Sequence, residues 1–338
     1  MLYVTTRNNR DTFTSSRAMM EDRAPDGGFY LPFRAPSFST EELDALAAMP
    51  FCQRIAEVLN RLFPLKLTRW DVEFSIGRNA VKLASLRHRI ILGEFWHNPE
   101  WTFRKLEAEL SQLLRKDGEF PGSWLRIAIR AALLSAVCME TVGNTGEKMD
   151  ISTVSGDLLW GISGWYARQW GIPIGDIILC CNENKCVWDL ICQGQLRTDT
   201  IAVTTELPEG DIAIAEELER LICGCGDRGE VERYLMCCRR GSTYYAEGTL
   251  LSALQKGNYV SVVSSSRIPD IITGAMGTHG YLLSPGAAMA YGGLLDYRAK
   301  KGSMACALVI CENSPVHDTE RLSGILGIPE QELKTLID

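Results

Sequence analysis

Short, continuously apolar runs alternate along the chain with longer stretches in which apolar residues recur three and four positions apart. The short runs are typical of strands buried on both faces, and the longer spacing is typical of helices that pack on a core. Their alternation predicts an α/β fold with a mainly parallel sheet flanked by helices. The predicted strands are residues 90–96, 149–154, 177–181, 259–263 and 306–310.

Polar caps and Gly or Pro stops delimit the predicted helices. Residues 39–42, Ser-Thr-Glu-Glu, have the pattern of a capping box and predict the start of a helix. Asp211 predicts the N-terminal cap of a helix that runs through Ile222. Residues 144–148 are expected to form an exposed loop. The other predicted helices are residues 53–63, 106–114, 124–138, 158–170, 287–300, one that begins near 268, and two short ones at the end of the chain.

The composition is that of an ordinary soluble globular protein. The chain has 338 residues, of which 46% are hydrophobic and 23% are charged. Its net charge is −7 and it has no block of Lys and Arg, so we expect no nucleic acid partner. No apolar run is long enough to span a bilayer, so we expect no membrane partner and a cytoplasmic location.

The chain contains twelve cysteines. A metal site of Cys223, Cys225, Cys237 and Cys238 would lack a Cys-x-x-Cys pair and a nearby histidine, so no metal ligand is predicted. The favoured interpretation is that the cysteines are reduced and buried as small hydrophobic side chains. Those in apolar runs include Cys138, Cys180, Cys181 and Cys306.

Several segments carry a family resemblance. Residues 94–105 read E-F-W-H-N-P-E-W-T-F-R-K, and residues 24–32 read A-P-D-G-G-F-Y-L-P. Residues 164–174 read G-W-Y-A-R-Q-W-G-I-P-I, and residues 280–285 read G-Y-L-L-S-P. These segments resemble E-L-F-H-G-P-T-L-A-F-K-D, A-P-D-G-G-L-Y-V-P, G-Y-Y-A-K-K-M-G-L-P-I and G-Y-L-L-D-P of the threonine synthase family. The resemblance implies the large domain of a fold-type II, tryptophan synthase beta-like enzyme that depends on pyridoxal phosphate (PLP).

The first segment also departs from the family at its reactive residue. In the family, the lysine after Phe forms the Schiff base with PLP, and here the aligned residue is Arg104. A guanidinium stays protonated and cannot condense with an aldehyde as a lysine amine can. Lys105 is the alternative, although neighbours on a helix point about 100° apart. Arg104 could bind an anion together with Arg126, or pair with Glu94 or Glu100.

The phosphate-binding loop of the family, G-N-F-G-N, aligns with Gly156, Asp157, Leu158, Leu159 and Trp160. Such loops work because glycines let backbone N–H groups approach phosphate oxygens at a helix N-terminus. Here Leu159 and Trp160 replace a glycine and an asparagine, and Asp157 adds a negative charge. We therefore expect this loop not to bind phosphate, and we expect Trp160 to fill the former cofactor cavity.

Further departures affect the rest of the site. Ala287 stands where the family supplies a hydroxyl to the pyridine nitrogen of PLP, and it has no polar group to offer. His97 matches a family histidine and has either a structural role at a strand end or a role in ligand binding. The family's domain-sized segment with the S-G-D-T-G motif has no counterpart between Arg104 and Trp124. The resemblance thus implies that the small mobile domain is missing.

The resemblance and the departures together predict a protein in two parts. Residues 1–65 form an N-terminal threonine-synthase-like segment, and residues 66–338 form a large domain of fold type II without the small domain. We expect no PLP and no catalysis, but a pseudoenzyme with a binding or regulatory role. Its partner would be a second copy or a paralogous enzyme, because loss of the small domain bares a surface. The alternative is a remodelled PLP-dependent lyase that uses Lys105 as its Schiff-base lysine.

Overall fold

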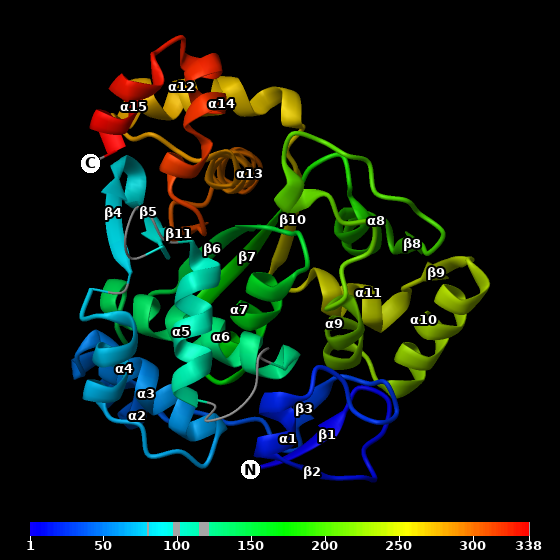
Figure 1. Ribbon diagram of the computed structural model, residues 1–338. Coiled ribbons are helices and arrows are strands. Elements are labelled where there is room, and N and C mark those ends of the chain that lie inside the picture. The colour runs from blue at the N-terminus through cyan, green and yellow to red at the C-terminus, as the bar shows by residue number, and fades with distance from the viewer. Residues whose placement is uncertain (80, 97–101, 115–121, 338) are drawn as a thin grey trace.

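A six-stranded sheet organises the described part of the chain (Figure 1). The computed structural model describes residues 1–338 except 80, 97–101, 115–121 and 338. The strand order is β10-β7-β6-β11-β5-β4, and only β4 runs antiparallel to its neighbour in this described sheet. The mainly parallel sheet confirms the predicted fold class. Its strands are β4 (Lys82–Leu86), β5 (Ile90–Glu94), β6 (Met149–Val154), β7 (Ile174–Cys181), β10 (Asn258–Val262) and β11 (Cys306–Cys311).

Alternating side chains of the central strands pack into two separate hydrophobic clusters. In β11, Leu308 and Ile310 join the cluster on one face of the sheet, whereas Val309 and Cys311 join the cluster on the other. Successive side chains of a strand point to opposite faces of the sheet. The side chains on both faces are apolar only when both faces of the sheet are covered. This double burial explains why the strands appear in the sequence as uninterrupted apolar runs.

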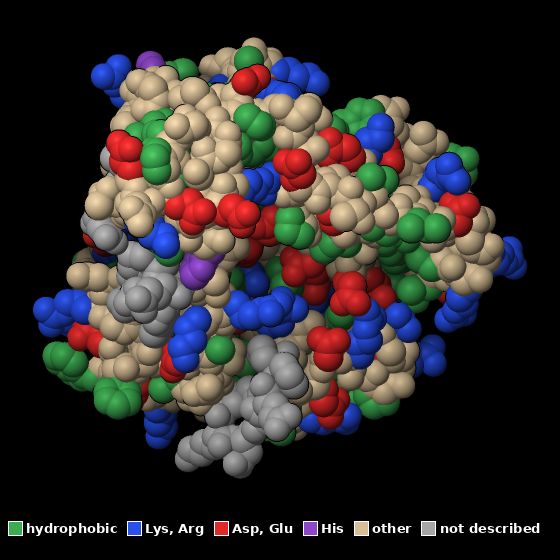
Figure 2. Space-filling view, turned by 45° about the horizontal axis from the view of Figure 1, so that its top comes forward, with side chains coloured by type: hydrophobic (Ala, Val, Ile, Leu, Met, Phe, Trp, Pro, Cys, Tyr) green, Lys and Arg blue, Asp and Glu red, His purple; other side chains and the backbone are tan. Residues whose placement is uncertain are grey.

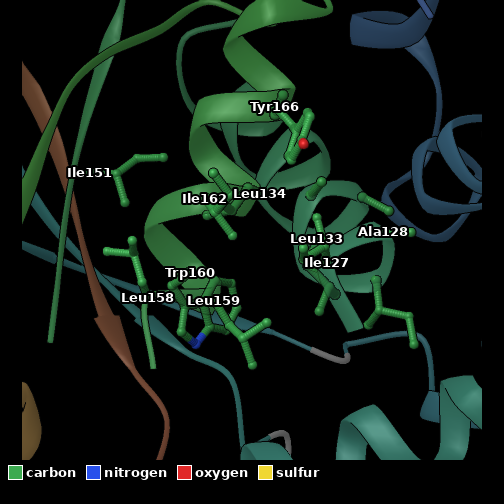
Figure 3. Close-up of a cluster of buried hydrophobic side chains, with 14 of the residues drawn as sticks. Ile127, Ala128, Leu133, Leu134, Ile151, Leu158, Leu159, Trp160, Ile162 and Tyr166 are labelled. Carbon is green, nitrogen blue, oxygen red and sulfur yellow. The ribbon is translucent and has the colours of Figure 1, made fainter. Parts of the chain in front are cut away.

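Helices cover both faces. On one face lie α7 (Leu159–Gln169), α6 (Ser123–Thr141) and α5 (Phe103–Leu114), and α13 (Pro285–Lys301) covers the other. Figure 3 shows side chains of α7 meeting those of α6 in the larger cluster. Nearly every side chain of α6 is buried, because α3 (Phe51–Leu62) packs against it from the outside. The predicted helix 124–138 is therefore a central, enclosed helix.

The N-terminal part forms a small antiparallel sheet of order β2-β1-β3 and a group of helices. It is joined to the rest by polar contacts: Glu219 accepts hydrogen bonds from Thr6 and Arg7, and the Trp124 indole N–H donates to the Tyr3 hydroxyl at 3.3 Å. A boundary near residue 65 stays a prediction. The elements before that boundary are β1 (Leu2–Thr5), β2 (Phe13–Thr14), α1 (Ser15–Met20), β3 (Tyr30–Pro32), α2 (Thr40–Ala48) and α3, and α4 (Arg69–Ile76) follows it.

The remaining elements connect and flank the large sheet. The helices are α8 (Cys186–Gln193), α9 (Leu218–Cys225), α10 (Arg228–Arg240), α11 (Gly248–Gln255), α12 (Ile268–His279), α14 (Thr319–Leu326) and α15 (Glu330–Ile337). The short helical turns are η1 (Arg87–Arg89), η2 (Pro208–Gly210), η3 (Ser265–Arg267) and η4 (Pro315–Asp318), and β8 (Gln195–Arg197) pairs with β9 (Thr243–Tyr245).

Two cap predictions had opposite outcomes. The capping box is confirmed, since Ser39 accepts from the Glu42 N–H and the Glu42 side chain accepts from the Ser39 N–H. The cap at Asp211 is wrong, because the helix begins only at Leu218. The Asp211 carboxylate instead accepts hydrogen bonds from Thr205 and from two asparagine side chains. It organises a loop, and its oxygens are thus not available to a helix N-terminus.

The structure also shows the surroundings of the cysteines and the length of the helices. Cys138, Cys180, Cys181 and Cys306 are buried and free, which confirms their interpretation as small hydrophobic residues. Within the described residues, no group of His, Cys, Asp and Glu side chains could hold a metal ion. The same part of the chain contains no helix that is long and apolar enough to cross a membrane.

Candidate functional site

A cavity of about 470 Å³ lies at the carboxyl ends of β6 and β11. Parallel α/β sheets bind their ligands at this edge, in the crevice outside the strand ends. The walls come from α5, α6, the loop that precedes α7, η2, the start of α13 and the residues that follow β11. Figure 2 shows basic side chains next to acidic ones around a hollow in one face of the molecule.

Three arginines line this pocket: Arg104, Arg126 and Arg130. Arg130 is buried and forms an ion pair with Glu107, yet its Nε has no hydrogen-bond partner among the described residues. Arg126 makes longer contacts, with Nε 3.5 Å from Glu107 and Nη2 3.7 Å from Asp157. Arg104 is exposed and makes no hydrogen bond or ion pair within the described part of the chain.

Trp160 forms a wall of the pocket. Its ring lies 4.7 Å from the Phe95 ring and 4.8 Å from the Phe103 ring, measured between centroids, and its indole N–H donates to the Glu312 carboxyl. Burial raises the pKa of that carboxyl, although Arg130 and the indole act in the opposite direction. The expectation that Trp160 fills the cavity is wrong, because these contacts hold the ring against the aromatic wall and leave the space beside it open.

The loop before α7 turns its carboxylate toward the start of the helix. Asp157 Oδ1 accepts a hydrogen bond from the Leu159 N–H at 3.0 Å. Gly156 and Leu158 have positive φ angles of 37° and 71°, which bring the chain sharply around at this point. Leu158 and Leu159 are buried in the core, with Trp160 beside them (Figure 3). The Asp157 carboxylate therefore occupies the place where a helix N-terminus would otherwise attract an anion.

The opposite wall combines an acid with an apolar surface. Oε2 of Glu209 is buried without a hydrogen-bond partner in the described residues, and burial raises the pKa of the Glu209 carboxyl. Ala287 contributes only its methyl group, while its backbone N–H is directed at the Ser284 hydroxyl at 3.4 Å. This wall can accept or donate one hydrogen bond through Glu209 and otherwise offers van der Waals contact.

Comparison with known proteins finds similarity to threonine synthases. The model of the threonine synthase N terminus matches residues 2–78. Threonine synthase of Methylobacillus glycogenes is 36% identical over 62 residues, which are 18% of this chain and 13% of that protein. Threonine synthase of Corynebacterium glutamicum is 28% identical over 102 residues, 30% of this chain and 21% of that protein. The matched parts thus span a small share of these curated relatives.

The fold is similar over nearly the whole chain. The structure described as PLP-bound threonine synthase from Brucella melitensis has a TM-score of 0.85 at 16% identity and covers 96% of this chain and 91% of that one. Threonine synthase from yeast has a TM-score of 0.84 at 14% identity and covers 96% and 90%. The fold of this chain is thus that of threonine synthases, and its N-terminal residues match the family model of the threonine synthase N terminus. The predicted resemblance is confirmed for the family and for the fold.

In this chain, α5 ends at Leu114 and α6 begins at Ser123, so their connection is too short for a folded domain. Lys105 does not line the pocket, and its Nζ lies 2.5 Å from Glu109 on the same helix. His97 lies outside the described residues. The sequence-predicted residues that line the pocket are Arg104, Arg126, Gly156, Asp157, Trp160 and Ala287, and Leu158 and Leu159 do not line it.

The polar residues of the pocket that the sequence reasoning missed include Arg130, Glu107 and Glu209. Arg130 lies inside the otherwise apolar run I-A-I-R-A-A-L-L, and a cation on a buried helix face is a signal that it has a partner. Glu209 carries no such signal, because it sits in a polar loop whose position only the tertiary structure fixes.

Proposed function

We propose that this threonine-synthase-like chain is a pseudoenzyme that does not use PLP and that binds a small anionic molecule in the pocket. The observation that carries the proposal is the hydrogen bond from the Leu159 N–H to the Asp157 carboxylate at the start of α7. In a phosphate-binding loop these backbone N–H groups face the phosphate. A fixed carboxylate both takes up a donor and repels a second anion at close range.

The residues of the pocket do not fit PLP in other respects. No lysine is among its described lining residues, and Lys105 is held by Glu109. Ala287 has no group that could hydrogen-bond a pyridine nitrogen. A PLP site needs a Schiff-base amine, a phosphate cradle and a partner for the ring nitrogen, so the misfit extends to each of these contacts.

The arginines of the pocket support the binding of an anion. Arg104 has no ion pair within the described residues, and the Nε donor of the buried Arg130 is unpartnered. Among the described residues, Arg126 is held only by contacts of 3.5 Å and 3.7 Å, so it can turn toward a ligand. Guanidinium groups bind carboxylates through paired N–H donors. We infer a small carboxylate as ligand, since a cavity of about 470 Å³ has room for a metabolite-sized molecule.

Adding PLP to the purified protein tests the loss of the cofactor. We expect no absorbance of an internal aldimine, and no specific lysine modified after borohydride reduction and peptide mapping. Stoichiometric labelling of Lys105, lost in Lys105→Arg, would overturn the proposal and establish the remodelled PLP-dependent lyase as the better description.

Calorimetric titration with a panel of small mono- and dicarboxylates tests the ligand class. Arg104→Met is expected to weaken binding at least about tenfold, because a hydrogen bond to a charged group contributes about 1.5–3 kcal/mol. Lys105→Met is the matched control, since it removes an equal charge from the same helix outside the pocket. Equal losses in the two variants, or no binding of any panel member, would contradict an anion site.

The proposal includes self-association or pairing with a paralogous enzyme. Its support is the exposed apolar face of α4, where Trp70 and Phe74 are 66% and 95% exposed and lie one helical turn apart. Light scattering of the purified chain is expected to show a dimer that Trp70→Ser/Phe74→Ser weakens. A monomer at all concentrations would count against the self-associating form.

A further inference from the structure

A second pocket, of about 420 Å³, lies at the opposite edge of the large sheet. Lys148 directly precedes β6, Gly257 directly precedes β10, and the first residues of β7 complete this edge. Helices α7, α9 and α11 supply the remaining walls. The pocket is thus at the amino ends of the strands, whereas the first pocket is at their carboxyl ends. Nothing in the proposed function uses it.

The charge of this second pocket is opposite to that of the whole chain. Lys148, Arg168 and Lys256 line it, and Asp176 is the only carboxylate among its described lining residues. Lys148 and Lys256 are exposed and form no ion pair with a described residue. The Asp176 carboxylate accepts a hydrogen bond from the Tyr297 hydroxyl of α13 at 2.9 Å. A net positive pocket in a chain of net charge −7 favours an anionic ligand.

Arg168 is fixed in place and still has donors to offer. Its Nη1 donates to the carbonyls of Gly175 at 3.0 Å and Gly257 at 2.6 Å, at the starts of β7 and β10. Nε and Nη2 have no hydrogen-bond partner among the described residues and are not enclosed by them. Gly257 permits this arrangement, because a Cβ there would lie 2.5 Å from Nη1. The guanidinium is therefore preorganised for an oxyanion.

Trp165 gives the pocket a flat aromatic surface. Its ring packs edge-on against Tyr166, with 5.0 Å between centroids. It also lies directly against Gly224 of α9, where a Cβ would come within 2.5 Å of the ring. The indole is thus held between two helices while part of it stays accessible to the cavity. A fixed indole beside three cations matches a ligand that is both planar and anionic.

We propose that this second pocket binds a nucleotide, with the base stacked on Trp165 and the phosphate held by Lys148, Arg168 and Lys256. Stacking of a base on an aromatic side chain contributes about 1–3 kcal/mol. Lysine and arginine supply the point charge and the planar donors that phosphate requires. The volume of about 420 Å³ accommodates a ligand of this size.

Calorimetric titration of the full chain with AMP tests the proposal, with adenosine and inorganic phosphate as separate probes. We expect AMP to bind at least tenfold more tightly than either part, since the two contacts add within one ligand. Lys148→Ala/Lys256→Ala is expected to weaken AMP binding at least tenfold. Lys301→Ala/Lys334→Ala, which removes the same charge from exposed positions outside the pocket, is the control and is expected to leave binding unchanged.

The proposal is overturned by no saturable binding of AMP, by equal loss in the control variant, or by inorganic phosphate that binds as tightly as AMP. Arg104→Met separates this site from the first pocket. Unchanged AMP affinity in that variant supports a site of its own, and a loss of AMP affinity would place the nucleotide in the first pocket and contradict the proposal.

Discussion

The indole N–H of Trp160, at the start of α7, donates a hydrogen bond to the carboxyl of Glu312, just after β11. This contact ties a helix on one face of the sheet to the edge where the first pocket opens. It also holds the carboxyl beside the guanidinium of Arg130, whose Cζ lies 5.4 Å from the centroid of the Trp160 ring. One aromatic residue thus shapes the pocket wall and the electrostatics of its neighbours.

Glu312→Gln is expected to make stability less dependent on pH. Burial raises the pKa of Glu312 in the folded protein above that in the unfolded chain, although Arg130 and Trp160 oppose the shift. Between these two pKa values the folded state binds more protons, so this carboxyl lowers the free energy of unfolding as the pH rises through the window. Glutamine keeps an oxygen acceptor for the indole and has no charge to bury.

Urea unfolding at pH 5 and pH 8 measures this effect. The wild type should lose more stability between the two pH values than Glu312→Gln does. The exposed Glu320→Gln is the control and should follow the wild type. Parallel pH dependence in all three proteins would contradict an enclosed Glu312 carboxyl.

Arg130→Met is expected to lower the free energy of unfolding by about 3–5 kcal/mol, because it leaves the Glu107 carboxylate buried without its main partner. The side chains of Arg130 and Glu107 are only 5% and 9% exposed. Arg104→Met should change stability by less than about 0.5 kcal/mol, since Arg104 is exposed and has no ion pair within the described residues. Urea unfolding at neutral pH measures the free energy of unfolding of the two variants.

The double variant Arg130→Met/Glu107→Leu makes this comparison sharper. Apolar replacement of both partners removes the unpaired charge and should recover most of the lost stability. Equal stability of the single and double variants would mean that Glu107 is not enclosed once Arg130 is gone.

Gly293→Ala tests the close contact of α13 with the large sheet. A Cβ at Gly293 would lie 2.2 Å from the Cys180 sulfur of β7, so the variant should lose about 1–3 kcal/mol through overpacking. Gly274→Ala in α12 is the matched control, because nothing lies within 4 Å of its added Cβ. It should keep or raise stability by up to about 1 kcal/mol through helix propensity. Thermal unfolding of both variants measures their difference in stability. Equal melting temperatures would disprove the close contact.

Ser39→Ala is expected to cost about 1 kcal/mol, because it removes the acceptor of the capping box at the start of α2. Ser16→Ala is the control, since its hydroxyl is exposed and makes only a 3.7 Å contact with the Met20 sulfur. Urea unfolding should show the loss for Ser39→Ala alone. No difference between the two would mean that α2 starts independently of its cap.

The sequence predicted the fold well where local rules decide it. The strand 149–154 and the capping box at Ser39 follow from the apolar pattern and from contacts between near neighbours. The helix cap at Asp211 failed because Asn182 and Asn184, distant in sequence, compete for its oxygens. Segments around Arg104, Gly156 and Ala287 pointed to one site, but only by resemblance. Their separation along the chain gave no geometric information.

By itself, the sequence determined the α/β fold class, the family resemblance and the replacement of lysine by Arg104, since these depend on residue identity and short-range periodicity. Only the tertiary structure decided what surrounds those positions. It placed the Trp160 ring at the side of the first pocket and not inside the cavity, because Phe95, Phe103 and Glu312 fix the ring from other elements. Burial, pKa shifts and cavities arise from atoms that meet across the fold, and a linear pattern contains no distances between such atoms.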